Sequence, residues 1–201
     1  MQCRTHIAFG IALSTAIIHT SDVKVLLTTV AGATIGGIIP DLDSYNSEIS
    51  QILNKITAII VSTVLVCVGV SYIFKIDIID KIVQYKNVAN ILIGVLVFLL
   101  VSILGSYTKH RTFMHSIPCV LIYYFILSTF LSQNFTLPFV VSMLAHIVLD
   151  LFNHIGVVLF CPLSEKRVCF DLCDSDGMVN NILFYISVFG AAYMATFVIG
   201  H

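Results

Sequence analysis

Long apolar segments recur along the whole chain, with short polar stretches between them. Seven such segments can be delimited, at residues 6–20, 24–40, 56–74, 88–107, 113–132, 136–160 and 179–200. A helix of about 20 apolar residues is long enough to cross the hydrocarbon core of a bilayer. The pattern therefore predicts an all-α, polytopic transmembrane bundle of about seven helices, of which five to seven span the membrane.

Prolines and small residues shape these segments. Pro40 closes the second one, because the residue before a proline is pushed out of the α region, and Pro162 follows the sixth. The run 31–37 at the end of the second segment is rich in Gly and Ala, and such residues let membrane helices approach closely. Since no internal repeat or linker divides the chain, we expect residues 1–201 to form a single domain.

The composition supports a membrane location. Of the 201 residues, 58% are hydrophobic and only 10% are charged, whereas soluble domains carry about 25% charged residues. The formal net charge of -1 provides no basic footprint for nucleic acid, so no nucleic-acid partner is indicated. The chain is expected to be an integral membrane protein whose main partner is the lipid bilayer.

The basic residues predict an orientation. If seven spans alternate, one face carries Arg4, Lys55, Lys109, Arg111, Lys166 and Arg167, and the other carries Lys24, Lys75, Lys81 and Lys86. Cytoplasmic loops are enriched in Lys and Arg. The excess on the first face predicts a multi-pass protein with a cytoplasmic N-terminus.

Ionisable residues interrupt the sixth segment at a regular spacing. His146, Asp150 and His154 recur every four residues, which places them on one face of a helix. Ionisable side chains at membrane depth are costly and are generally functional. His154 is the least secure member, because near the helix end it also fits an interfacial histidine.

Three further polar clusters are expected on the same membrane face as this stripe. They are Thr5 with His6, Asp41 with Asp43, and the run from Lys109 to Ser116 that contains His110, Arg111 and His115. Imidazole and carboxylate together suit divalent Zn, Mn or Fe, and the carboxylates carry enough charge for one or more ions. Two ions could clamp a phosphoryl group, and Arg111 could bind a phosphate bidentately.

Plainer interpretations exist for these clusters. Asp150 could be a helix-interior carboxylate paired with a Lys or Arg from another segment, but no segment offers one in its middle. Asp is common in solvated turns, so Asp41 and Asp43 could simply follow Pro40 at a helix end. His110 and His115 could be ordinary loop residues, with Ser116 or Thr112 capping the fifth helix. Cys169 and Cys173 lack the usual metal or redox spacing, and the acidic loop with Asp171 and Asp174 fits solvent better than a calcium site.

The motifs, taken in order, resemble a known family. The order of Thr5-His6, Gly37 to Asp43, His110-Arg111 to His115-Ser116 and His146-x3-Asp150-x2-Asn153 is similar to that of the YdjM-type proteins, described as LexA-binding, inner-membrane-associated, metal-dependent hydrolases. The resemblance covers nearly the whole chain and implies an inner-membrane hydrolase-like domain. The implied metal ligands are His6, Asp41, Asp43, His110, His115, His146 and Asp150. The His-x3-Asp motif is also similar to one in zinc-dependent phospholipases C, which suggests a phosphoester or phospholipid substrate.

These observations lead to a hydrolase hypothesis with two rivals. In the hypothesis, zinc is the favoured ion, Arg111 holds the substrate phosphate, and Asn153 or Ser116 orients the ligands. The rivals are a metal-ion or proton transporter and a non-catalytic protein with a structural metal. One difficulty is depth, because a sixth helix running to Phe160 would leave His146 about 21 Å from its end. Either that helix ends near Gly156, or the site is a deep, water-filled funnel.

Overall fold

The computed structural model describes residues 2–44, 55, 59, 86–174 and 177–199. Within these residues the regular structure is helical, which confirms the all-α class. The helices are α1 (Cys3–Ile18), α2 (Val23–Ile38), α5 (Lys86–Ser106), α6 (Ile117–Ser128), α7 (Gln133–Leu151) and α8 (Met178–Ile199), with short 3₁₀ helices η1 (Ile39–Asp43) and η2 (Phe113–His115). The predicted segment 56–74 lies almost entirely outside the described residues, so the total of seven helices is not confirmed.

Four stretches in the described part of the chain are long and apolar enough to cross a membrane. They are Val23–Asp43, Val88–Ser106, Gln133–Leu151 and Met178–Thr196. Helix α1 and helix α6 are apolar but shorter. A helical bundle with four candidate membrane spans is therefore observed in the described residues, whereas the predicted number of spanning helices is not tested.

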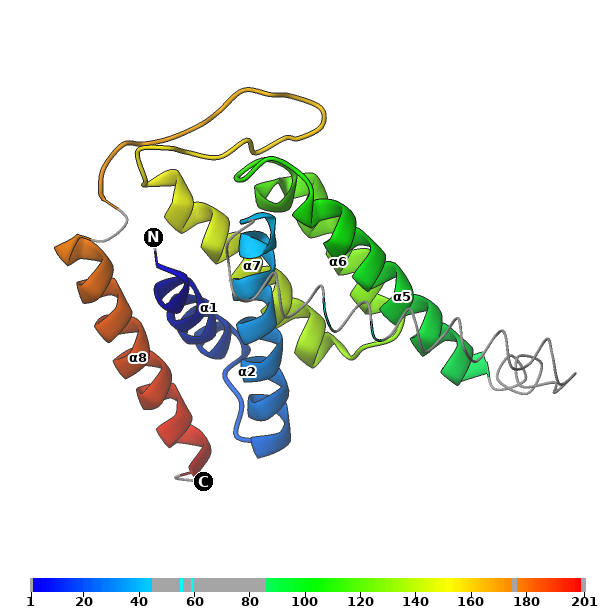
Figure 1. The fold of residues 1–201 in the computed structure, drawn as a ribbon. Helices are drawn as coiled ribbons and strands as arrows, with labels where there is room; N and C mark the ends of the chain where they lie inside the picture. The colour runs from blue at the N-terminus through cyan, green and yellow to red at the C-terminus, as the bar shows by residue number, and fades with distance from the viewer. Residues whose placement is uncertain (1, 45–54, 56–58, 60–85, 175–176, 200–201) are drawn as a thin grey trace, which may run out of the picture.

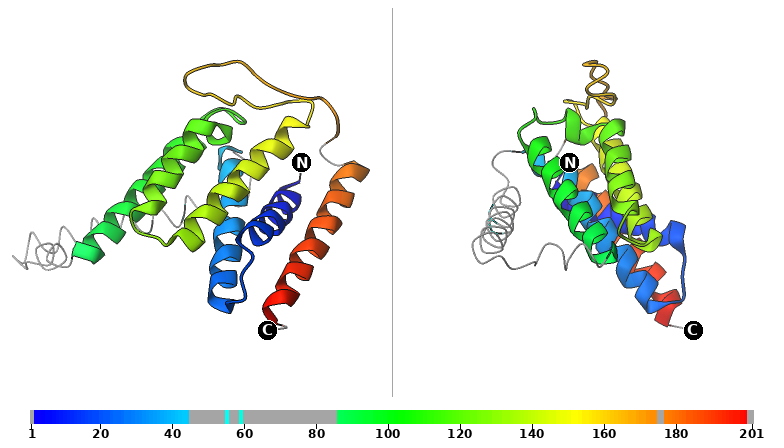
Figure 2. Two further views of the ribbon diagram at one scale, coloured as in Figure 1. Left: turned by 180° about the vertical axis from the view of Figure 1, so that it is seen from behind. Right: turned by 90° about the vertical axis from the view of Figure 1, so that its right-hand side faces the viewer.

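Helix α7 lies at the centre of the bundle. It packs against α1 and α2 on one side and against α6 on the other, while α8 packs on α1 and α5 on α6 (Figures 1 and 2). Small residues allow the contact with α2: an added Cβ at Gly36 would lie 2.1 Å from the carbonyl oxygen of Phe139, and one at Gly32 would lie 2.4 Å from that of Phe135. The close approach predicted for the glycine-rich second helix is thus observed.

An apolar core lies between α7 and α6. Phe139, Met143 and Ile147 of α7 belong to one buried cluster with Tyr123 and Leu127 of α6. The buried Tyr123 hydroxyl is satisfied by a hydrogen bond of 2.9 Å with the Ser102 hydroxyl of α5. This core lies along the length of the helices, so it fixes their ends relative to one another.

Two predicted helix boundaries were wrong. The sixth segment was expected to run over 136–160, but α7 ends at Leu151, and the chain pairs Val157 with Val168 instead. Asn153 accepts a hydrogen bond from the backbone N–H of His154, and Gly156 has a φ of +63°, so the backbone turns away from the helix axis. The fifth segment, expected over 113–132, splits into η2 and α6.

The split in the fifth segment has a local cause. Ser116 adopts an extended conformation between η2 and α6, and its hydroxyl accepts a hydrogen bond from the Cys119 N–H. A proline occupies the first turn of α6, where its missing N–H costs nothing. The capping role considered for Ser116 is therefore observed, and the break places His115 immediately outside the helix.

Candidate metal centre

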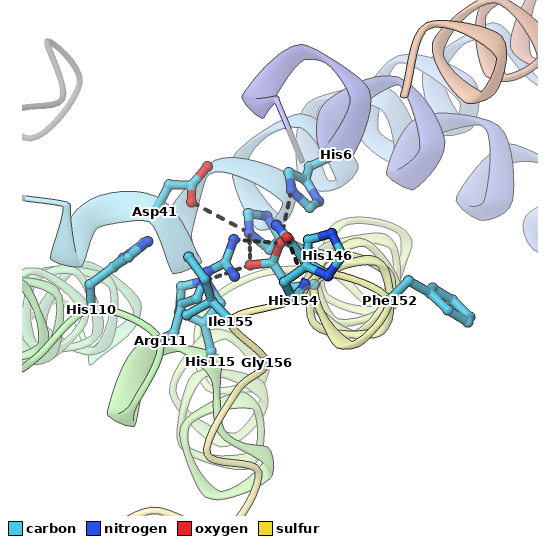
Figure 3. Close-up of polar contacts among 12 residues, drawn as sticks. His6, Asp41, His110, Arg111, His115, His146, Phe152, His154, Ile155 and Gly156 are labelled. Atoms are coloured by element: carbon cyan, nitrogen blue, oxygen red, sulfur yellow. Dashed lines mark hydrogen bonds and ion pairs between the residues drawn. The ribbon is translucent and has the colours of Figure 1, made fainter. Parts of the chain in front are cut away.

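The four polar clusters meet at one end of the bundle. His6 comes from the start of α1, Asp41 from η1, His115 from η2, and His146 and Asp150 from the last turns of α7 (Figure 3). The short α7 explains this meeting, because His146 lies only five residues, or about 7.5 Å, before the helix end. Of the two expected alternatives, the early helix end is observed, five residues before Gly156, so the position of His146 does not require a deep funnel.

Two overlapping groups of side chains have the geometry to hold a cation. In the first, ligand atoms of His6, His146 and Asp150 all lie within 4.8 Å of one another, and all three residues are buried. The His6 Nε2 is 3.5 Å from Asp150 Oδ1. The rings of His6 and His146 are stacked with centroids 3.7 Å apart, so the imidazoles from α1 and α7 lie face to face.

The second group shares a histidine with the first. Asp41, His115 and His146 also have ligand atoms within 4.8 Å of one another. The His146 Nε2 is 3.5 Å from Asp41 Oδ1 and 3.7 Å from Asp150 Oδ2. The His115 Nε2 in turn lies 3.3 Å from Asp150 Oδ2. Five of the seven predicted ligands are thus brought together around one small volume.

A backbone carbonyl orients the shared histidine. The His146 Nδ1 donates a hydrogen bond of 2.8 Å to the carbonyl oxygen of Gly37 in α2. A carbonyl can only accept, so Nδ1 carries the proton and Nε2 keeps its lone pair toward the carboxylates. Such hydrogen bonds commonly set the tautomer of metal-binding histidines. Gly37 begins one of the motifs of the resemblance, but no sequence signal pointed to its carbonyl as the partner of His146, because a backbone oxygen is available at every position.

Asp43 has its oxygens engaged with neighbouring groups. Its Oδ1 is 2.6 Å from His110 Nδ1, and its Oδ2 accepts from the Arg111 backbone N–H at 3.0 Å and lies 3.3 Å from His115 Nδ1. His110 stands at the rim, with 45% of its side chain exposed. Both residues therefore lie beside the two cation-holding groups, where Asp43 supports the ring of His115.

Arg111 is held rigidly at the edge of the centre. Its φ is 63°, and its backbone is fixed by the Asp43 carboxylate on one side and by the Val158 N–H, which donates to its carbonyl oxygen at 3.1 Å, on the other. The buried guanidinium donates from Nη2 to Asp150 Oδ1 at 3.2 Å. Its Nε and Nη1 have no hydrogen-bond partner among the described residues.

Unpaired buried nitrogens provide a test of whether a metal fits. Within the described part of the chain, the His6 Nδ1, the His146 Nε2 and both His115 nitrogens lack a hydrogen bond. The His115 nitrogens and the His146 Nε2 instead make ion-pair contacts of 3.3–3.7 Å with carboxylate oxygens. A buried polar atom without a hydrogen bond costs about 1–3 kcal/mol, so three such histidines in one place require an explanation. Imidazole nitrogens converging on carboxylates are the usual donors for Zn, and the donor set therefore fits a divalent cation.

Asn153 and His154 lie just beyond the centre. Asn153 is buried and its Oδ1 accepts from the His154 N–H, so it stabilises the turn that ends α7. His154 is half exposed and faces Asp171 and Asp174 of the polar loop. The hydrogen bond to Asp171, and to a smaller extent that to Asp174, raises the pKa of His154. The helical stripe stops before His154 because α7 ends at Leu151.

Comparisons with known proteins relate nearly the whole chain to one family. A family model described as YdjM inner membrane protein matches residues 1–199. The uncharacterized protein YvsG of Bacillus subtilis (strain 168) is 27% identical over 184 residues, which are 91% of this chain and 86% of that protein. No solved structure matches the chain.

Proposed function

The chain belongs to the YdjM inner membrane protein family, and from this membership and the geometry of the centre we propose that it is a membrane-embedded, metal-dependent hydrolase of phosphoesters, with phospholipids as the favoured substrate class. The arrangement of the centre carries the proposal. Buried imidazole nitrogens that have no hydrogen bond within the described residues converge on carboxylates, and the buried guanidinium of Arg111 beside them has N–H groups without a partner among the same residues. The first feature fits a cation and the second an anion, and a phosphoester hydrolase needs both.

The ligands proposed for the ion are His6, Asp41, His115, His146 and Asp150. Asp43 and His110, also predicted as ligands, are proposed instead to position His115 and the Arg111 backbone, because the Asp43 oxygens already contact those groups. Since His146 offers only Nε2, a single ion shared between the two groups is favoured over two separate ones. Zinc is the favoured metal for this donor set.

Each chain residue has a distinct task in the proposed reaction. A bound zinc ion would act as a Lewis acid and lower the pKa of a water molecule toward neutrality. Arg111 would donate to a phosphoryl oxygen from an N–H group that has no partner within the described residues, while its bond from Nη2 to Asp150 keeps the guanidinium plane beside the ligands. Asn153 would stabilise the turn that ends α7 beside the centre.

Metal analysis tests the first half of the proposal. The detergent-purified protein is expected to contain close to one equivalent of a divalent metal, and His146→Ala is expected to lose it. His154→Ala is the matched control, because that imidazole lies outside both groups and should leave the metal content unchanged. Negligible metal in the wild-type protein after growth with zinc would overturn the proposal.

Activity tests the second half. The metal-loaded protein should cleave members of a panel of phosphodiesters and phospholipids, and Arg111→Gln should lose about 10²–10³-fold in kcat, the loss expected when a preorganised donor to a developing negative charge is removed. Full metal occupancy without turnover of any phosphoester would instead favour a structural metal. Transport of the metal into vesicles without turnover would favour the transporter.

A further inference from the structure

The loop that joins α7 to α8, residues 152–174, is an ordered structure anchored beside the candidate centre. Val157 and Val168 pair through two backbone hydrogen bonds of 3.0 and 2.9 Å. The Phe170 N–H donates to the carbonyl of Leu151 at 2.7 Å, and that of Leu172 donates to the carbonyl of Phe152 at 2.9 Å. The α7–α8 loop is therefore tied back to the end of α7.

This loop exposes large apolar side chains. Exposed fractions are 84% for Leu163, 69% for Leu172, 55% for Phe170 and 54% for Phe160, and the Phe170 ring packs only on that of Phe152, with centroids 5.6 Å apart, among the described residues. A short ordered loop in water gains nothing from presenting four such side chains. Their exposure is of the kind that marks an interaction surface.

The position of the loop indicates its partner. It begins where α7 ends at Leu151 and finishes where α8 begins at Met178, and both helices are long and apolar enough to cross a membrane. The loop runs across the end of the bundle that holds the candidate centre (Figure 1). Because both ends of the loop meet the membrane surface, the bilayer is the apolar phase within reach of its side chains.

Charged residues at the loop tip fit the same partner. Lys166 is exposed three residues after Leu163, with the exposed Glu165 between them, and charged side chains that alternate with apolar ones are typical of segments at the level of lipid headgroups. Arg167 is also exposed, and its Nη1 donates to the carbonyl of Ile155, within the same loop, at 3.3 Å. Both basic side chains thus lie at the surface of the loop, and that of Arg167 also stabilises the conformation of the loop.

We infer that the α7–α8 loop lies in the headgroup layer of the bilayer, with Phe160, Leu163, Phe170 and Leu172 inserted into the phospholipid surface. The loop also touches the centre, because the Val158 N–H donates to the carbonyl of Arg111. Insertion would therefore set the arginine at headgroup level. The placement of the loop itself does not depend on the proposed hydrolase and can be tested without turnover.

The absence of tryptophan from the chain allows a direct depth measurement. Leu163→Trp is placed in the full-length protein and reconstituted into phosphatidylcholine–phosphatidylglycerol vesicles with bromine at defined acyl depths. Its emission should be blue-shifted from that of a free tryptophan amide, and quenching should be strongest with bromines nearest the headgroup. Phe189→Trp, on the exposed face of α8, is the matched control for a residue deep in the bilayer.

Three results would overturn the inference. Tryptophan at position 163 that is quenched by aqueous iodide and untouched by brominated lipid would place the loop in water. Protection from both quenchers would mean that a second copy, another protein or another part of the chain covers it. A quenching profile equal to that of Phe189→Trp would place it deep in the hydrocarbon. Leu172→Trp repeats the measurement should Leu163→Trp fail to fold, as judged by its elution and thermal unfolding.

Discussion

The candidate centre and the loop cluster of His154, Asp171 and Asp174 are both made of histidine and aspartate, and they meet the chain only a few residues apart, at Asp150 and His154. They differ in whether the histidine nitrogens have hydrogen-bond partners. In the candidate centre, His6, His115 and His146 are buried, and several of their nitrogens face carboxylates at 3.3–3.7 Å without a hydrogen bond from the described part of the chain. In the loop cluster, both nitrogens of His154 are hydrogen-bonded to Asp171 and Asp174, and all three side chains are half exposed or more. The residue types are the same, so burial and satisfaction, more than composition, distinguish a candidate cation site from a solvated ion pair.

The largest expected effect comes from removing the shared carboxylate. Asp150→Asn should abolish metal binding and lower the free energy of unfolding by about 3–5 kcal/mol, because Arg111 loses the charge that pairs with it in a buried site. Metal content and denaturant unfolding in detergent measure both effects. Asp171→Asn in the loop cluster should change neither the metal content nor the free energy of unfolding. Equal metal content in the two variants would contradict the assignment of the metal site to the candidate centre alone.

A supporting carboxylate should have a smaller effect. Asp43→Asn is expected to weaken metal affinity by about 10–100-fold while the protein stays folded, since the carboxylate orients His115 and would not touch the ion. A competitive chelator titration measures the affinity. Complete loss of metal would show instead that Asp43 is a ligand, as the sequence resemblance implied.

The packing around the two clusters should respond unequally to an added methyl group. Gly36→Ala would force a Cβ to within 2.1 Å of the Phe139 carbonyl oxygen between α2 and α7, and overpacking of this kind costs about 1–3 kcal/mol. Thermal unfolding reports the loss. At Gly177, beside the loop cluster, the nearest atom would be 3.6 Å away, so Gly177→Ala should be close to neutral. A destabilised Gly177→Ala with an unaffected Gly36→Ala would contradict the packing described.

The smallest effect concerns pH at the loop cluster. Asp171 and Asp174 raise the pKa of His154, so the protonated imidazole stabilises the loop below its unfolded pKa of about 6.5, and that contribution is lost as the pH rises through the folded pKa. In an NMR titration, Asp171→Asn should lower the pKa of His154 toward its ordinary value. The metal content of Asp171→Asn should equal that of the wild type. A lower metal content would show that the loop cluster contributes to the metal site.

Much of the candidate centre could be predicted from the sequence because its residue types are rare at membrane depth. His146 and Asp150 stand out in an apolar segment, and Asp41, Asp43 and His115 lie beside segment ends. Two other features could not be predicted. The bond from His146 to Gly37 uses a backbone oxygen, and the fixed conformation of Arg111 depends on Val158, 47 positions later in the chain.

His154 shows where periodicity fails. A spacing of four residues predicts a common face only while the helix continues, and α7 ends at Leu151. The boundary error had this cause: apolar residues continue to Phe160, but the backbone of Val157 pairs with that of Val168. Hydrophobicity cannot distinguish a buried helical residue from one in an ordered loop.

The sequence by itself determined the membrane class, the helical fold and the residues able to hold a cation, because apolar length and the cost of buried charge act at the level of single segments. The tertiary structure decided which of these residues meet. It ended α7 early, brought the start of α1 and the end of α2 against it through glycine contacts, and separated His154 from His146. These outcomes depend on packing and on hydrogen bonds between distant segments, which the local sequence pattern does not contain.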